Sequence, residues 1–526
     1  MGIARTGAVA LLGVEGHRVE VEAHVRGGRG SLNLVGLPDP ALREARDRIR
    51  AAIINSGEYF PDGHITVSLS PASLPKRGSG FDLGIATAVL AANGQVPLDD
   101  IRGAVLIAEL GLDGSARAVP GVLPAVLACR AAGVATVVVA RGNATEAQQV
   151  PGMRVVAVST LADLIARLRG EIREDTASTG TTDSIGCGAE GRAGCAPAPP
   201  APSASASAAT RVDLADVLGQ ELARNAMEIA AAGGHNVFLL GSPGAGKSLL
   251  AERLPTILPS LTTAESLEVS AIHSVAGALA PERPLVTEPP FRAPHHSATR
   301  AAVVGGGTTV LQPGAASLAH RGVLLMDEAP EFDSGILDAL RQPLETGEIV
   351  VSRAAATARF PARFQLVLAA NPCPCSQPGH LCTCPATVRR RYLARLSGPL
   401  LDRVDMKIEV VPATRAELLG SPAAAESSAT VADRVAQARE RAAERLRDTP
   451  WCVNAAVPGS ELRRRFPLPG QATGVLSRAL ERGTISARGV DRITRVAWTV
   501  ADLARRPHPT AEEVGFALAL WSGTAR

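Results

Sequence analysis

Aromatic residues are scarce in this sequence, at 3% of its 526 residues, so its apolar cores must consist mainly of Leu, Val, Ile and Ala. No apolar run reaches the ~18 residues that a membrane-spanning helix requires. The run near the N-terminus is too short, and too soon interrupted by charge, for a signal peptide. We therefore expect a cytoplasmic protein with no membrane partner. Its 8 cysteines would then stay reduced and serve metal binding or packing rather than disulfides.

A strong net charge is also lacking, because the formal value at pH 7 is +3. No overall field would attract nucleic acid, so any contact with phosphate must come from local groups of basic residues. The charge balance by itself therefore does not indicate such a partner.

The chain is too long for one hydrophobic core, and several domains are expected. Its composition changes sharply at residues 176–210, which are mostly Ala, Ser, Thr, Gly and Pro, with Ile185 the only large aliphatic residue. Such a segment cannot bury enough apolar surface to offset the entropy lost on ordering. We predict a disordered linker at residues 173–210, in which Cys187 and Cys195 are incidental.

The patterns on both sides of the linker predict an α/β protein. Residues 1–172 mix alternating stretches such as HITVSLSP with helical spacing, which indicates a compact α/β domain. Residues 211–412 contain a strand–loop–helix unit followed by further apolar strands, which favours a parallel sheet covered by helices. Residues 413–526 have helical spacing and are predicted to form an α-helical lid.

The stretch GSPGAGKS fits the phosphate-binding pattern G-x-x-x-x-G-K-[ST]. It follows the apolar strand NVFLL and enters the helical stretch SLLAERL, which is the context that the motif requires. Its glycines let backbone N–H groups curl around phosphate oxygens at a helix N-terminus. Lys247 should reach the β- and γ-phosphates of ATP, and Ser248 should help to hold Mg²⁺. The predicted ATP-binding residues are Gly241, Ser242, Pro243, Gly244, Ala245, Gly246, Lys247, Ser248 and Asp327.

Two further apolar strands end in polar side chains. GVLLMDE delivers two carboxylates to the phosphate end of the sheet, where Asp327 would bind Mg²⁺ and Glu328 would activate the attacking water. FQLVLAAN ends in Asn371, whose amide could hold that water or sense the γ-phosphate. Because Asn also ends strands for turn reasons, the role of Asn371 depends on the other two motifs.

These three motifs resemble those of AAA+ ATPases. The stretches FRAPHHSATRAAVVGGG, LAHRGVLLMDEAPEF and RYLARLSGPLLDRVD resemble the magnesium-chelatase-like branch, and most of the chain is similar to the ComM/YifB family. The resemblance leaves out the linker and the stretch around residues 421–428. It implies an N-terminal Lon-protease-like α/β domain, an AAA+ P-loop module and an α-helical lid.

The resemblance also implies roles for two arginines. Arg403 in LLDRVD matches the family's arginine finger, which reaches a neighbouring subunit's γ-phosphate and stabilises charge in the transition state. Arg488 in SARGVDRI matches the lid arginine called sensor 2. A finger supplied by a neighbour implies a homo-oligomeric ring, in this family usually a hexamer. The alternative for both arginines is an ordinary surface salt bridge. The predicted catalytic residues are thus Glu328, Asn371, Arg403 and Arg488.

The stretch ETGEIVVSRAAATARFPARFQLV is predicted to form a hairpin, which matches the pre-sensor hairpin that points into the pore of related rings. Contacts with a phosphate backbone need only Lys or Arg and backbone donors. The alternative is that the basic residues here are solvated loop charges, or that the His pair caps a turn. The candidate contacts with single-stranded or branched DNA are Arg292, His295, His296, Arg300, Arg353 and Arg359.

LPKRGSGFDL resembles the active-site stretch of Lon proteases, but the position of the nucleophile falls on Gly80 and that of the catalytic lysine falls on Leu123. Glycine cannot attack a carbonyl and leucine cannot take a proton. A substitute pair of Ser79 and Lys76 is displaced by one residue and lacks a base in the second segment. We expect no protease activity from this domain, which could instead serve subunit contacts or DNA handling.

Four cysteines lie close together in NPCPCSQPGHLCTCP, as two C-x-C pairs. Four thiolates suit tetrahedral Zn²⁺, although C-x-C is tighter than the usual spacing. The alternative is two thiol pairs without metal. A catalytic zinc is disfavoured because four cysteines leave no open position for water. The candidate ligands of a structural zinc are Cys373, Cys375, Cys382 and Cys384.

Three functions compete. The family resemblance implies a DNA-remodelling motor, a helicase or branch-migration enzyme used in natural transformation or recombination. The chelatase resemblance implies the ATPase subunit of a metal-insertion complex, which the long domain ahead of the P-loop disfavours. The missing catalytic dyad disfavours an ATP-dependent protease. The sequence therefore favours the DNA-remodelling ATPase.

Overall fold

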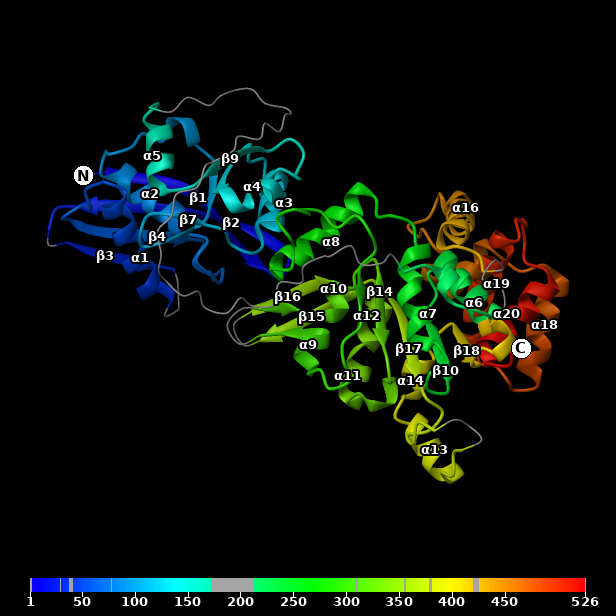
Figure 1. Cartoon of the computed structure of the whole chain (residues 1–526). Coiled ribbons are helices and arrows are strands. Elements are labelled where there is room, and N and C mark those ends of the chain that lie inside the picture. Colours follow the sequence, from blue (N-terminus) through cyan, green and yellow to red (C-terminus); the bar gives the residue numbers. More distant parts are fainter. Residues whose placement is uncertain are drawn as a thin grey trace.

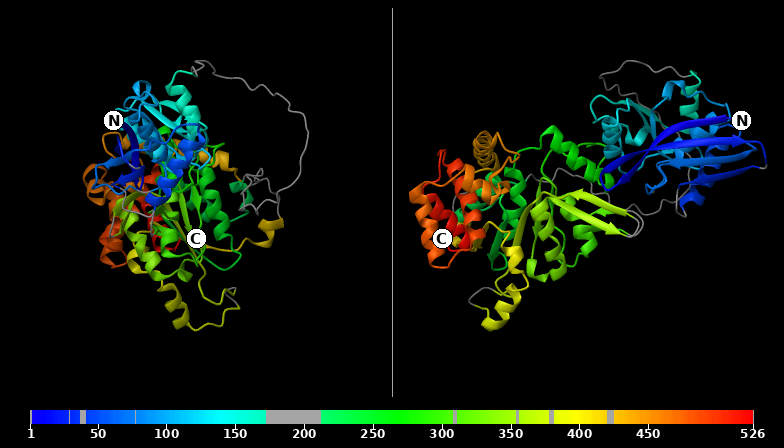
Figure 2. Two further views of the ribbon diagram at one scale, coloured as in Figure 1. Left: turned by 90° about the vertical axis from the view of Figure 1, so that its left-hand side faces the viewer. Right: turned by 180° about the vertical axis from the view of Figure 1, so that it is seen from behind.

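The computed structural model describes residues 2–28, 30–36, 41–76, 78–171, 212–307, 311–353, 356–377, 381–419 and 425–525. The molecule is elongated, with the N-terminal sheet at one end, a second sheet in the middle and the C-terminal helices at the other end (Figure 1, Figure 2). The predicted linker at residues 173–210 lies outside the described residues.

The N-terminal part is built on a seven-stranded mixed sheet in the order β3-β4-β2-β1-β5-β8-β9. Strands β1 and β2 pair antiparallel, and side chains along β2 alternate between buried and exposed, as expected for a sheet with one covered face. The strands are β1 (Gly2–Leu12), β2 (Glu15–Arg26), β3 (Ser31–Val35), β4 (His64–Ser70), β5 (Val105–Ile107), β8 (Thr136–Ala140) and β9 (Arg154–Val158), with β6 (Glu109–Leu110) and β7 (Ala116–Arg117) forming a separate small pair. The helices are α1 (Ala41–Asn55), α2 (Asp82–Ala92), α3 (Val122–Ala131), α4 (Ala144–Ala147) and α5 (Leu161–Leu168).

The middle part is an open sheet of five parallel strands in the order β11-β14-β17-β10-β18. Its central strands β14 and β17 are buried at every position, because helices cover both faces. The predicted parallel sheet with covering helices is therefore confirmed. The strands are β10 (Val237–Gly241), β11 (Phe291–Arg292), β14 (Val323–Met326), β17 (Gln365–Ala370) and β18 (Met406–Val410).

Helices of this part begin and end at recognisable signals. Thr262 and Glu265 form a capping box at the start of α8, and Gly234 ends α6 in the left-handed conformation. The helices are α6 (Glu221–Gly233), α7 (Lys247–Arg253), α8 (Thr263–Val275), α9 (Arg300–Val304), α10 (Ala315–Leu318), α11 (Ser334–Ala339), α12 (Arg341–Thr346), α13 (Ala386–Leu393) and α14 (Gly398–Leu401), and β12 (Gly305–Gly306) pairs with β13 (Gln312–Pro313).

Two features project from the middle part. The predicted hairpin is present, with β15 (Glu348–Arg353) antiparallel to β16 (Ala356–Pro361), and it extends toward the N-terminal sheet (Figure 1). Helix α13 stands away from the body of the molecule on the side opposite α8 (Figure 1).

The C-terminal helices pack against one face of the five-stranded sheet. Val431 of α16, Leu476 of α18 and Val496 of α19 belong to the same apolar cluster as Leu239 of β10 and Ile408 of β18. The helices are α15 (Arg415–Leu419), α16 (Ser428–Leu446), α17 (Gly459–Arg465), α18 (Gly470–Glu481), α19 (Ala487–Leu503) and α20 (Ala511–Ser522).

The N-terminal domain rests on α8 and on the hairpin. The backbone N–H of Gly121 donates to the carbonyl of Ser274 at 3.0 Å, and Leu11 and Val14 pack against the apolar cluster that contains Val351 of β15. The contact at the hairpin is close, because a Cβ at Gly13 would lie 2.7 Å from the carbonyl oxygen of Arg359. Gly13 also has φ +66, so glycine is required there for two reasons.

Asp405 joins the C-terminal helices to the sheet. Its carboxylate is 1% exposed and lies 2.6 Å from Arg492 of α19 and 3.4 Å from His235. It also accepts the backbone N–H of Asn236 at 3.1 Å. Burial raises the pKa of Asp405, but Arg492 and His235 outweigh burial and hold that pKa well below its usual range. One carboxylate thus fastens the starts of β10 and β18 to the lid.

Replacing Asp405 with Asn should lower the free energy of unfolding by about 2–4 kcal/mol at pH 7, because Arg492 would lose its buried counter-charge. The pKa of Asp405 is lower in the folded state than in the unfolded state, where it is about 4. The ionised carboxylate therefore contributes its full stabilisation above the unfolded-state pKa, and this stabilisation is lost as the pH falls toward the folded-state pKa. The gap in thermal unfolding midpoint between the wild type and Asp405→Asn should therefore narrow between about pH 5 and pH 3. The matched control Asp433→Asn, at an exposed position of α16, should leave the midpoint unchanged. A difference in unfolding midpoint between the wild type and Asp405→Asn that stays constant over this pH range would contradict the stabilising role of the ionised Asp405.

Candidate functional site

A cleft of about 360 Å³ opens at the carboxyl edge of the five-stranded sheet. Because all five strands are parallel, the segments that follow β10, β14 and β17 meet at this edge. The cleft is lined by Pro243, Gly244, Gly246, Lys247, Ser248, Leu249, Asp327, Glu328 and Asn371. The structure therefore brings the three sequence motifs together in one cavity.

The phosphate-binding loop leaves β10 and enters α7. Gly244 has φ +76 and Gly246 has φ +90, values that favour glycine over any other residue. Gln220 supports the loop from outside, since its side-chain amide donates to the carbonyl of Ala245 at 2.5 Å. A Cβ at Gly246 would lie 3.1 Å from that same amide nitrogen. Sequence reasoning missed Gln220, because no motif marks a residue that acts on the loop from a different segment.

Lys247 is fixed by three oxygen acceptors. Its Nζ donates to the carbonyls of Gly241 at 2.8 Å and Ser242 at 2.9 Å, and to Oδ1 of Asn371 at 2.9 Å. Burial lowers the pKa of Lys247, against the opposing effect of the Asp327 and Glu328 carboxylates. The ammonium therefore joins the end of β10 to the end of β17.

Ser248 and Asp327 form an oxygen pair next to this lysine. The Ser248 hydroxyl donates to Oδ2 of Asp327 at 2.5 Å, and Oδ1 of Asp327 accepts the backbone N–H of Glu328 at 2.8 Å. A hydroxyl and a carboxylate are oxygen ligands of the kind that Mg²⁺ takes in nucleotide sites. The two residues thus fit the predicted magnesium role.

A histidine that the sequence offers as a DNA contact lies beside Glu328. Oε2 of Glu328 lies 3.1 Å from Nδ1 of His296, a residue that the sequence offered as a DNA contact. The backbone of Glu328 has φ +51, and such strain at a non-glycine residue is typical of functional sites. The structure therefore places His296 beside the Glu328 carboxylate, a contact that the sequence did not predict.

Asn371 connects the cleft to the cysteine-rich loop. Its Nδ2 donates to the Ser376 hydroxyl at 3.4 Å, while its Oδ1 accepts from Lys247. Ser376 has φ +50, so the loop turns sharply at that point. The position of the predicted sensor amide therefore depends on the fold of the loop that follows it.

Arg403 lies at the opposite edge of the sheet. Its carbonyl accepts from the side chain of Asn236 at 3.0 Å, and Asn236 immediately precedes β10. The five residues of β10 span about 17 Å, which separates Arg403 from the phosphate loop of the same chain. Its side chain is 10% exposed, and its guanidinium donates to the carbonyl of Pro399 and the carboxylate of Glu345.

Arg488 lies near Arg403 rather than in the cleft. It stands in the first turn of α19, is 77% exposed, and its guanidinium is 3.9 Å from the Asp402 carboxylate. The two predicted catalytic arginines thus share one region of the molecule, and this region is remote from the phosphate loop of their own chain.

Family models match most of the chain. "Magnesium chelatase, subunit ChlI" matches residues 213–418, "Subunit ChlI of Mg-chelatase" matches residues 21–143, and "Magnesium chelatase, subunit ChlI C-terminal" matches residues 425–520. The magnesium-chelatase 38 kDa subunit of Cereibacter sphaeroides is 31% identical, but over 30% of this chain and 51% of that protein.

Three relatives match over nearly their full length. An uncharacterized protein of Mycobacterium tuberculosis is 49% identical over 100% of both chains. Competence protein ComM of Haemophilus influenzae is 39% identical over 98% of this chain and 97% of its own. The uncharacterized protein YifB of Escherichia coli is 40% identical over 94% of this chain and 92% of its own. The chain belongs to the ComM/YifB family of magnesium-chelatase-like proteins. The resemblance predicted from the motifs is therefore confirmed.

Membership in the ComM/YifB family implies an AAA+ ATPase that uses ATP and Mg²⁺, and the residues of the cleft fit both. Within the described residues, no helix combines the length and the apolar character needed to cross a membrane.

The other DNA candidates of this ComM/YifB protein differ in their surroundings. Arg359 on β16 is 63% exposed and 3.4 Å from Glu348 on the paired strand, whereas Arg292 on β11 is partly buried, and burial lowers its pKa. His295 bonds to the Ser297 hydroxyl at 2.8 Å, and Arg300 is exposed at the start of α9. Arg353 ends β15, and its side chain lies outside the described part. These contacts stay predictions.

In the segment that resembles the Lon-protease active site, Ser79 and Lys76 bond to different groups. The Ser79 hydroxyl donates to the Glu109 carboxylate, and the ammonium of buried Lys76 donates to the carbonyl of Pro71. Leu123 is fully buried in α3, and Gly80 lines a largely apolar cavity of about 270 Å³ between this domain and the middle part. Ser79 and Lys76 therefore have different partners.

Replacing His296 with Ala should lower the kcat of basal ATP hydrolysis about 3- to 10-fold, because Glu328 would lose the group that orients it. ATP affinity, measured with a fluorescent nucleotide, should stay within about twofold, since the phosphate loop is untouched. The neighbouring His295→Ala is the matched control and should leave kcat near the wild-type value. A faster rate in His296→Ala would show that His296 restrains Glu328, and would contradict the orienting role.

Proposed function

We propose that this protein is a ring-forming AAA+ ATPase that uses ATP hydrolysis to remodel single-stranded or branched DNA, as a helicase or branch-migration enzyme. The observation that supports the ring-forming ATPase is the division of the proposed catalytic residues between two edges of one sheet, while the DNA-remodelling part rests on the similarity to competence protein ComM. Groups that bind phosphate and activate water lie at the carboxyl edge, while Arg403 and Arg488 lie at the other end of the strands. A second copy of the chain is the natural source of the missing arginines.

Each residue of the cleft has a definite task in this proposal. Lys247 binds the β- and γ-phosphates, and the loop from Gly241 to Gly246 supplies backbone N–H donors. Glu328 accepts a proton from the attacking water, and Asn371 holds that water near the γ-phosphate. Ser248 and Asp327 would hold Mg²⁺, which would supply positive charge to neutralise the phosphate oxygens.

The arginines act between subunits. In the isolated chain, Glu345 holds the Arg403 guanidinium, so a neighbouring subunit's phosphate must displace that carboxylate. An arginine supplied in this way stabilises the charge of the transition state and makes hydrolysis depend on assembly. Arg488, exposed beside it, is available to the same neighbour. Because a head-to-tail contact that closes forms a ring, we propose a homo-oligomer, with a hexamer as the expected size.

Rings assembled from two inactive variants test this arrangement. Arg403→Ala and Glu328→Gln should each lose nearly all ATPase activity when assembled alone. The two variants are co-expressed with different tags, and rings that contain both are purified through the two tags in turn. In these rings an intact phosphate site should face an intact Arg403 at about a quarter of the interfaces. The ATPase activity should therefore recover to about a quarter of the wild-type value. Doubly tagged rings that remain inactive would contradict an arginine acting from the neighbour.

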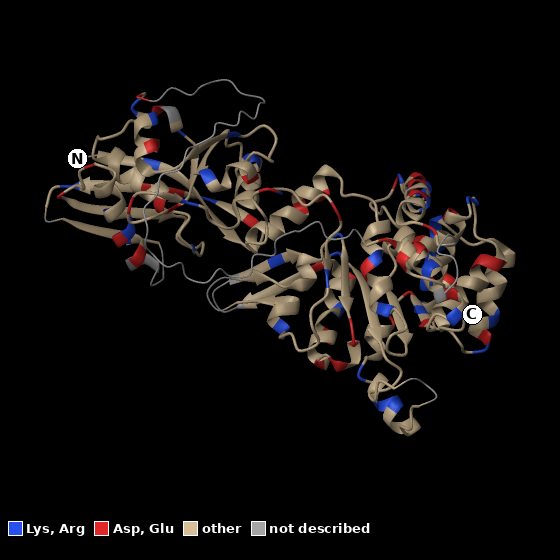
Figure 3. Cartoon of the chain, in the orientation of Figure 1, with Lys and Arg blue, Asp and Glu red and all other residues tan. Residues whose placement is uncertain are grey.

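The hairpin is the proposed DNA-gripping element. The N-terminal domain packs against the middle of its strand β16, where a Cβ at Gly13 would lie 2.7 Å from the carbonyl oxygen of Arg359, and the hairpin presents the Arg359 side chain at its surface. Charges of both signs are interspersed over the molecule (Figure 3), so contact with DNA would have to be local. Recombination or natural transformation is the proposed setting, in the cytoplasm. The name of the relative from Haemophilus influenzae, competence protein ComM, supports natural transformation.

A motor subunit of a metal-insertion complex is the second candidate. The descriptions of the three matching family models favour it. The chelatase subunit of Cereibacter sphaeroides, however, matches 30% of this chain, while ComM of Haemophilus influenzae matches 98%. We also propose that the protein is not a protease, because Gly80 and Leu123 occupy the positions of the dyad.

Forked and four-way DNA should stimulate ATP hydrolysis several-fold, and the protein should displace or migrate strands with ATP but not with a non-hydrolysable analogue. Lys247→Ala should lose both nucleotide binding and strand movement, whereas Glu328→Gln should keep nucleotide binding and lose strand movement. Absence of stimulation by every DNA tested, together with stimulation by a chelatase partner subunit, would favour the second candidate instead.

A further inference from the structure

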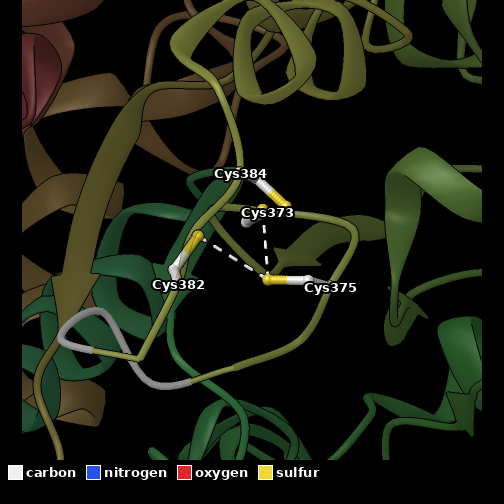
Figure 4. A group of neighbouring side chains, drawn as sticks. All are labelled: Cys373, Cys375, Cys382 and Cys384. Atoms are coloured by element: carbon white, nitrogen blue, oxygen red, sulfur yellow. Dashed lines mark hydrogen bonds between the residues drawn. The ribbon is translucent and has the colours of Figure 1, made fainter.

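Four cysteine thiols converge in the loop between β17 and α13. Their sulfur atoms all lie within 4.8 Å of one another, with Sγ of Cys375 3.4 Å from that of Cys373 and 3.6 Å from that of Cys382 (Figure 4). These separations are too long for a disulfide, whose S–S bond is about 2.05 Å, and the cysteines are free. The cluster is Cys373, Cys375, Cys382 and Cys384.

The spacing fits one tetrahedral ion. Thiolate sulfurs bound to Zn²⁺ at about 2.3 Å lie about 3.8 Å from one another at the corners of a tetrahedron, close to the distances between these thiols. Cysteine thiolates are ligands that zinc prefers. Four of them fill the coordination sphere, so no position remains for a reacting water, and the site would be structural.

The loop has little else to hold it in place. Among the described residues from 372 to 391, only Cys373 is buried. Segments that cannot form an apolar core depend on cross-links or metal ions for order. The loop nevertheless carries a sharp turn at Ser376 and supports α13, which stands away from the body of the molecule (Figure 1).

The loop connects the cleft with an exposed basic helix. At one end, Cys373 follows Asn371 by two residues, and Ser376 accepts the hydrogen bond from Asn371. At the other end, Cys384 precedes α13, where Arg389, Arg390 and Arg391 are exposed. Order in the cysteine cluster therefore bears directly on the position of the Asn371 amide.

We propose that Cys373, Cys375, Cys382 and Cys384 bind one structural Zn²⁺, which holds Asn371 in the position where it contacts Lys247. The part of this proposal that concerns Asn371 rests on the proposed ATPase function. The metal itself does not, because its presence is measured without ATP or DNA.

Metal content is the first test. The full-length protein, purified without chelator or added metal and analysed by plasma mass spectrometry, should contain about one zinc per chain. Cys382→Ser/Cys384→Ser should contain none. Cys452→Ser, which removes an exposed cysteine outside the cluster, should retain the full amount. Absence of zinc from the wild type, one iron in its place, or zinc retained by the double variant would overturn the site.

Cobalt provides a measurement that does not depend on the folding of a variant. The wild-type protein, stripped of metal and reloaded with Co²⁺, should show the visible absorption bands of tetrahedral thiolate coordination, and one equivalent of Zn²⁺ should remove them. A spectrum typical of octahedral oxygen coordination would overturn the assignment of these ligands.

The positioning role has its own readout. In Cys382→Ser/Cys384→Ser the kcat of basal ATP hydrolysis should fall about tenfold, while the Kd for a fluorescent ATP analogue should change less than about threefold, since the loop from Gly241 to Ser248 is intact. Cys452→Ser should match the wild type in both. A zinc-free double variant with unchanged kcat would overturn the role in positioning Asn371. An equal loss of kcat and of nucleotide affinity would also overturn the role in positioning Asn371, because it would indicate a general collapse of the fold.

Discussion

The parallel direction of five strands is the constraint on which this structure depends. Since all five strands end at one edge, a lysine after β10, two carboxylates after β14 and an amide after β17 meet in a single cleft. Lys247 then joins two of these strand ends through its bonds to Gly241 and Asn371. The chemistry of the cleft is therefore a consequence of sheet topology, with each reactive side chain placed by the strand before it.

The same constraint leaves the other edge of the sheet for assembly. The starts of β10 and β18 are held to the lid by Asp405, a buried carboxylate stabilised by Arg492 and His235. Arg403 lies two residues from Asp405, and Arg488 is close by. A strand's length separates these arginines from the phosphate loop of their own chain. Both are thus suited to serve a neighbouring subunit, in agreement with the proposal that hydrolysis depends on the ring.

Much of the fold and of the cleft could be predicted, because the motifs are local. The phosphate loop, the strand before Asp327 and the hairpin β15–β16 each depend on a few consecutive residues. Predictions were weakest where a role depends on distant segments. The neighbours of His296 in the sequence predict a contact with DNA, which stays a prediction, and they give no sign that His296 lies 3.1 Å from Glu328. Gln220, which supports the phosphate loop, carries no signal in the sequence.

The family, the order of the elements and the candidate residues for phosphate and magnesium follow from the sequence alone, because glycine spacing and strand-end carboxylates are read along the chain. Tertiary structure alone decided which of these side chains touch. It brought four thiols within 4.8 Å of one another in the loop that follows Asn371, and it placed two arginines away from their own cleft. The physical reason is that such distances depend on strand order and helix packing, which bring together residues far apart in the chain.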